Sequence, residues 1–102
     1  MKKYDYMADM GCIKIMGSDC SIFFLNGYGD GMHKVNVCKE EEIPTDADFK
    51  GHFTVLKKAW LMYSDCMNEG RQHEFGKGRW FVSLDKDETT FYIYKMDEDL
   101  HA

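Results

Sequence analysis

The chain has 102 residues, of which 44% are hydrophobic and 15% aromatic, and its formal net charge is -5. This length fits one domain, and the aromatic content with a single proline indicates a packed fold instead of a disordered chain. No apolar run approaches the roughly 20 residues of a membrane span, and the amino-terminal segment lacks the apolar stretch of a signal peptide, so we expect a cytoplasmic protein.

Three strands are predicted before residue 40, at 11–16, 20–26 and 32–39, because apolar and polar residues alternate between glycine-containing turns. Turns at 17–19 and 27–31 predict two hairpins in which Phe23 lies between Ile13 and Val35. The same register places Cys20 opposite Cys38 on the outer face of the sheet. Without a secretion signal we expect both thiols to be reduced, although this pair is the one place where oxidation is geometrically conceivable.

The strongest pattern in the sequence predicts one long amphipathic helix over 45–69. Thr45 and Asp48 resemble a capping box after Pro44, and Gly70 is a natural stop. An apolar stripe recurs at spacings of four and three residues, and such a stripe would cover one face of a sheet. The stripe consists of Phe49, Phe53, Leu56, Trp60, Tyr63 and Met67.

Two further strands are predicted at 79–84 and 89–96, joined by the loop 85–88, which pairs Val82 with Phe91 and Trp80 with Ile93. The element order is therefore β-β-β-α-β-β. The predicted fold class is α+β, an antiparallel sheet with the long helix packed on one face. We expect a single domain over 1–102 whose ends, 1–9 and 97–102, are flexible.

The cysteines and histidines do not form a pattern typical of a metal site or a catalytic centre. No two cysteines are close enough in sequence for a short ligand motif, and the four histidines fall in different predicted segments. Nothing in the spacing brings Cys38 or Cys66 near a histidine that would activate a nucleophile. We therefore expect no metal, no cofactor and no enzymatic activity.

The sheet face opposite the predicted helix is too apolar to face only water. Such a patch is typical of a surface that binds another protein or a second copy of the chain. The alternative is that residues 4–7 of the amino-terminal segment cover it. The candidate partner-binding residues on this face are Phe24, Phe81, Tyr92 and Tyr94.

Two groups of charged residues are further candidates for contacts. Acidic residues cluster in two segments and would orient a basic partner. The loop 70–79 is the most basic segment, and its glycines would let backbone amides approach an anion, unless it is a plain exposed connection. The acidic residues are Glu40, Glu41, Glu42, Asp85, Asp87 and Glu88, and the candidate anion contacts are Arg71, Lys77 and Arg79.

These features predict a small acidic, non-enzymatic module that regulates or inhibits a partner by occupying its surface. One version is a phage-type anti-defence inhibitor that competes for a basic, nucleic-acid-binding groove. The alternative hypothesis is a module that binds single-stranded nucleic acid through aromatic residues of the sheet face. The net charge of -5 argues against that alternative and is also modest for a full mimic of DNA.

Overall fold

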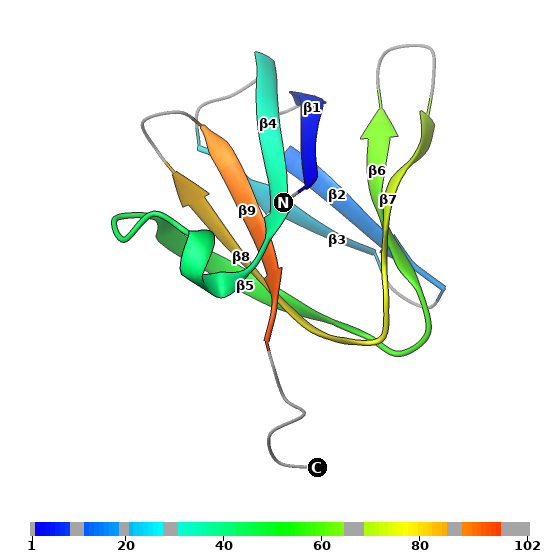
Figure 1. Ribbon diagram of the computed structural model, residues 1–102. Helices are drawn as coiled ribbons and strands as arrows, with labels where there is room; N and C mark the ends of the chain where they lie inside the picture. The colour runs from blue at the N-terminus through cyan, green and yellow to red at the C-terminus, as the bar shows by residue number, and fades with distance from the viewer. Residues whose placement is uncertain are drawn as a thin grey trace.

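The computed structural model describes residues 2–8, 12–18, 21–27, 31–64, 69–85 and 89–96, and within them it is a sandwich of two β-sheets (Figure 1). Sheet A has the order β1-β4-β9-β8-β5, and sheet B has the order β3-β2-β6-β7. Neighbouring strands are antiparallel except β4 and β9, which are parallel. Sheet A contains β1 (Lys2–Ala8), β4 (Gly31–Cys38), β9 (Thr90–Lys95), β8 (Gly78–Asp85) and β5 (Asp48–Val55); sheet B contains β3 (Ser21–Leu25), β2 (Cys12–Gly17), β6 (Ala59–Ser64) and β7 (Glu69–Phe75).

The predicted helix over 45–69 is wrong, and with it the α+β fold class. That segment forms β5 and β6, and the one helical element in the described residues is the 3₁₀ turn η1 (Glu40–Glu42). Phe53 and Val55 point into the core from β5, and Ala59 and Leu61 do so from β6. A short turn over 56–58 sets Val55 and Ala59 four residues apart, a spacing that imitates a helical stripe although each strand alternates with period two.

The predicted pairing of the second and third strands is also wrong. β3 belongs to sheet B and β4 to sheet A, so Phe23 is not opposite Val35, and the β3–β4 pairing on which the Cys20–Cys38 prediction rested is not formed. Cys20 itself lies outside the described residues. The first hairpin exists, but Ile13 pairs with Phe24 instead of Phe23. This slip of one residue exchanges the two faces of β3.

The other strand predictions fare better. The five strands expected outside the helical segment are confirmed to within one residue at each end. In the last hairpin Val82 pairs with Ile93 instead of Phe91, a shift of two residues that keeps the same side chains on the inner face. Residues 2–8, expected to be flexible, form β1 and pair with β4, whereas 97–102 lie outside the described part of the chain.

The core lies between the two sheets and is formed by alternate residues of both. Gly51 has φ +149°, a conformation that side chains disfavour, and a Cβ atom there would lie 3.1 Å from the Phe24 ring. Glycine therefore lets Phe24 of sheet B pack against the backbone of sheet A. The largest fully buried apolar side chains are Phe75, Phe91, Ile13, Ile15, Leu61, Leu84, Ile93, Val35 and Val82.

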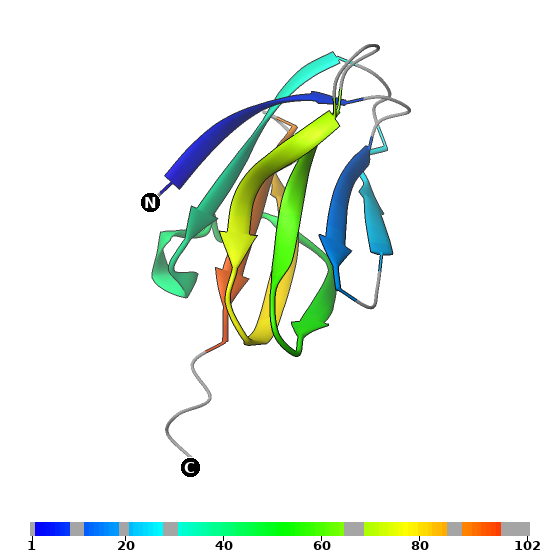
Figure 2. The same cartoon turned by 90° about the vertical axis from the view of Figure 1, so that its right-hand side faces the viewer.

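The connection from β4 to β5, residues 39–47, runs along the outside of sheet A. β4 and β5 lie on opposite sides of β9 and β8, and in both views the connection with η1 stands away from sheet B (Figures 1 and 2). Three outward-facing residues of sheet A, Asn36, Ser83 and Tyr92, are buried.

The described residues include no helix long and apolar enough to cross a membrane.

Candidate binding faces

An aromatic patch lies on the outer face of sheet A, made of Phe49, His52, Phe81 and Tyr94. The register places Tyr94, Phe81 and His52 side by side on consecutive strands. Phe81 stacks on Tyr94 with ring centroids 5.6 Å apart, and Phe49 lies 6.0 Å from Phe81. Phe49 is 59% exposed, so an accessible aromatic ring continues the row at the edge of the sheet.

The acidic turn η1 adjoins this patch through Cys38, which pairs with Tyr94 in the register and lies two residues before Glu40. Burial, with the negative charges of Glu42 and Glu41, raises the pKa of the Cys38 thiol to about 11. The thiol therefore stays protonated near neutral pH and is a poor nucleophile.

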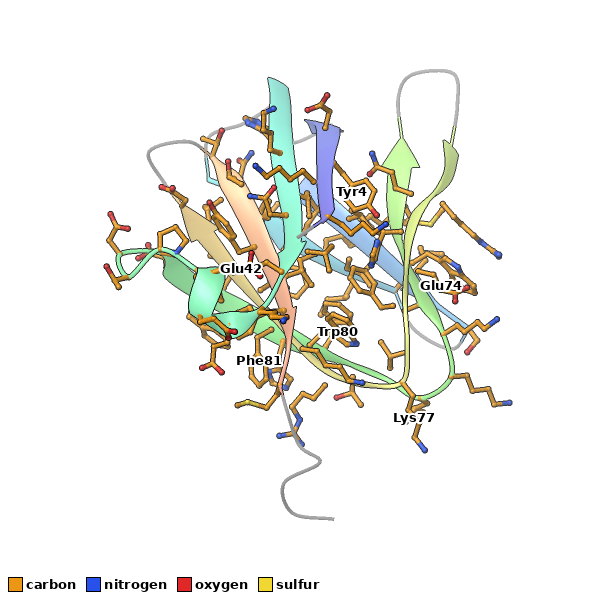
Figure 3. The ribbon with its side chains drawn as sticks, in the orientation of Figure 1. Tyr4, Glu42, Glu74, Lys77, Trp80 and Phe81 are labelled. Atoms are coloured by element: carbon orange, nitrogen blue, oxygen red, sulfur yellow. The ribbon has the colours of Figure 1, made fainter. Side chains whose placement is uncertain are left out.

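A cavity of about 540 Å³ opens on the other side of the acidic turn. Trp80 forms its aromatic wall, and its indole N–H donates to the carbonyl oxygen of Gly76 at 3.0 Å. Figure 3 shows Trp80 between β9 and β7, with Phe81 and Glu42 on the far side of β9. Because carboxylates and ammonium groups both line the cavity, its charge selects no class of small ligand. The remaining lining residues are Lys2, Val37, Cys38, Lys39, Glu40, Glu41, Glu42 and Lys95.

The structure separates the predicted partner-binding residues. Phe81 and Tyr94 do share an outer face, and η1 adjoins it. Phe24 is 6% exposed and belongs to the core, because Ile13 pairs with Phe24 and not, as predicted, with Phe23. Tyr92 is also buried, at 8% exposed, between its neighbours on sheet A. Asp85 lies at the opposite end of β8 from Gly78, away from η1. Asp87 and Glu88 lie outside the described residues.

The three candidate anion contacts also lie in different places. Arg71 is on β7 of sheet B, Arg79 is on β8 of sheet A, and Lys77 is in the turn between those strands. The predicted loop over 70–79 is mostly strand, so its side chains alternate between faces. The guanidinium of Arg71 instead lies 3.9 Å above the centre of the Trp60 ring.

The outer face of sheet B carries exposed apolar residues that the sequence did not single out. Phe23 is 55% exposed and Leu25 is 61% exposed, both on the edge strand β3. The Lys14 ammonium lies 5.6 Å from the centre of the Phe23 ring. The run Ser21–Leu25 has four consecutive apolar residues, so alternation could not reveal which of them face outward.

Side chains between the sheets include one perturbed histidine. The Tyr4 hydroxyl and His73 Nδ1 form a hydrogen bond of 2.5 Å that joins β1 to β7. Burial and the nearby Lys2 lower the pKa of His73 below its ordinary value. In the described ranges no three His, Cys, Asp or Glu side chains converge in a way that could hold a metal ion.

Comparisons with models of known protein families, with curated proteins and with solved structures found no match to this chain.

Proposed function

We propose that the chain is a non-enzymatic protein-binding module that occupies a basic surface of a partner with the outer face of sheet A. The observation that carries this proposal is the exposed Phe49 ring at the end of the aromatic patch, on the face that the acidic turn adjoins through Cys38 and Tyr94. An aromatic anchor with charges at its rim is typical of protein interfaces.

The charge on this side of the molecule selects the class of partner. Glu40 and Glu41 are exposed and form no ion pair among the described side chains. Their carboxylates are free to meet arginine or lysine residues, which would raise the association rate and fix the orientation of the complex. The aromatic patch would supply the apolar burial that surface charges alone do not provide.

Occupying a basic surface would make the chain a regulator or inhibitor of its partner. Where that surface is a groove that binds nucleic acid, the acidic turn would compete with phosphate groups for the same cations. This is the mode of action expected of an anti-defence inhibitor of phage type.

The test is the affinity of the chain for a protein with a basic groove, first captured from cell extract with the chain and then purified. We expect Glu40→Gln with Glu41→Gln, and separately Phe49→Ala, to weaken the complex at least about tenfold, which is about 1.4 kcal/mol. The matched charge control is Asp5→Asn with Glu74→Gln, whose exposed carboxylates lie elsewhere in weak pairs with Lys34 and Lys58. Equal affinities for all three variants and the wild type would contradict the proposal.

A second candidate function is binding of single-stranded nucleic acid on the outer face of sheet B. Cations lie over aromatic rings there, Lys14 over Phe23 and Arg71 over Trp60, and such pairs suit phosphates and stacked bases. A labelled oligonucleotide titrated with the chain measures this directly. Loss of binding in Arg71→Ala would support it, and absence of binding at low salt would exclude it.

A further inference from the structure

Among the described residues the two sheets have four edge strands, which differ in how they are protected against pairing with another chain. An edge strand presents unpaired backbone groups, and charges or bulges normally prevent its pairing. β1 carries Lys2, Lys3 and Asp5. β5 has a register shift between Phe49 and Gly51. β7 carries charged side chains, and its pairing with β6 contains a register shift.

The edge strand β3 has none of these protections. Its sequence, Ser21–Leu25, contains no charge and no proline, and its pairing with β2 is regular. In the described part of the chain β3 pairs with β2 alone, and it forms the margin of the sandwich in Figure 2. The exposed rings and methyl groups of Phe23 and Leu25 make this edge apolar as well as open.

We propose that β3 pairs antiparallel with β3 of a second copy of the chain, across a two-fold axis, so that sheet B continues through the dimer. In a pairing centred on Phe23, this residue faces its own counterpart and Ser21 faces Leu25 of the second copy. Aromatic and aliphatic cross-strand pairs of this kind stabilise a sheet, and the strand places no like charges opposite each other.

The charges near β3 are compatible with a second copy. Lys14 lies directly opposite Phe23 on β2, so the two Lys14 residues of a dimer would be three strand spacings apart. At about 4.8 Å per spacing this is roughly 14 Å, which exceeds the Debye length of about 8 Å at physiological ionic strength. The other three edges are protected, so pairing through β3 ends at two chains and does not continue into fibres.

Light scattering on the full chain, over a range of concentrations, tests the dimer. We expect the measured mass to rise from 11.9 kDa towards twice that value. Phe23→Lys should lower the association constant at least tenfold, because it places charges in the middle of the new strand pair. Leu25→Lys, at the other exposed position, should act in the same direction. Phe49→Lys is the matched control, since Phe49 is similarly exposed on sheet A, and it should leave the dimer intact.

Amide hydrogen exchange on the same samples locates the contact. We expect the backbone amides of Ser21–Leu25 to become more protected as the dimer forms, in wild type and not in Phe23→Lys. A chain that stays monomeric at all concentrations, assembles beyond two copies, or dimerises equally well in Phe23→Lys would overturn the proposal. Because Phe23 lies on sheet B, its loss leaves the sheet A face available, so this test is independent of the proposed partner.

Discussion

The outer faces of the two sheets differ in how much of them is covered. On sheet A the residues at the centre of the face, such as Tyr92 and Ser83, are buried, and exposed aromatic surface remains at the β5 edge. On sheet B the exposed apolar residues Phe23 and Leu25 lie on the edge strand, and a cation lies over each of two aromatic rings, Phe23 and Trp60. Alternation along a strand therefore decides which residues face outward, while connections and neighbouring side chains decide which of those are exposed.

The difference matters for function because the two faces would bind different things. The acidic turn adjoins the sheet A face, which suits a basic partner. The sheet B face has Lys14 and Arg71 on its surface and an unprotected edge. A dimer through β3 would then leave one acidic, aromatic face free on each copy, so that a partner with two basic sites could be bound with avidity.

The largest expected effect distinguishes neighbouring residues of β3. Phe24 packs on Phe53 and on the Gly51 backbone, so Phe24→Ala should lower the free energy of unfolding by about 3–5 kcal/mol. Phe23→Ala should change it by less than about 0.5 kcal/mol in the monomer, since the ring is exposed. Urea denaturation at low protein concentration measures both. Similar losses for the two variants would mean that β3 has the other register.

The next effect concerns the covered part of sheet A. Tyr92 faces away from the core and yet is 8% exposed, so Tyr92→Ala should cost about 2–3 kcal/mol of unfolding free energy. Phe49→Ala, on the exposed part of the same face, is the control and should be nearly neutral. If Tyr92→Ala were as mild as Phe49→Ala in urea denaturation, the contrast between the two faces would disappear.

A smaller effect is expected where the two sheets come closest. Gly51→Ala forces a side chain into a disfavoured φ and against the Phe24 ring, and should cost about 1–2 kcal/mol. Gly70→Ala is the matched control, because a Cβ there meets nothing within 4 Å. Thermal unfolding of both variants checks the prediction, and a stabilised Gly51→Ala protein would refute it.

The smallest effect is a pH dependence at the junction of β1 and β7. The lowered pKa of His73 means that the folded chain prefers the neutral imidazole. The unfolded chain therefore takes up this proton first, so stability is complete above about pH 6.5 and falls as the pH drops through that value towards the folded pKa. We expect the thermal midpoint to fall over this pH range because of this group. His73→Gln should reduce the fall, and an unchanged fall would exclude His73 as its source.

Local patterns in the sequence predict most of the strands but not their partners. Alternation located five strands, because each strand carries that signal within itself. The helix prediction failed because the turn at 56–58 joins two short strands. It places the inward-facing Val55 and Ala59 four residues apart, which is also the spacing of one face of a helix. The parallel contact of β4 with β9 depends on residues far apart in the chain, and no turn specifies it.

The candidate site shows the same limit. Phe81 and Tyr94 were assigned correctly to an outer face, since the pairing of β8 and β9 keeps their parity. The prediction placed Phe23 inward and Phe24 outward, whereas the hairpin loop is one residue longer than predicted and the two positions are reversed. Four consecutive apolar residues contain no alternation that would reveal this error. Burial of Tyr92 could not be foreseen, because β4, which lies beside it in sheet A, is brought there by a long-range pairing.

β9 also determines when sheet A can assemble. It lies between β4 and β8, so before it is made the β1–β4 pair and the β5–β8 pair have no strand in common. On the ribosome these two strand pairs would keep open inner edges until Thr90–Lys95 has been synthesised. Long-range pairing of this kind is slow, in the range of milliseconds to seconds. The chain is therefore most vulnerable to chaperone capture and to misassembly just before β9 is synthesised.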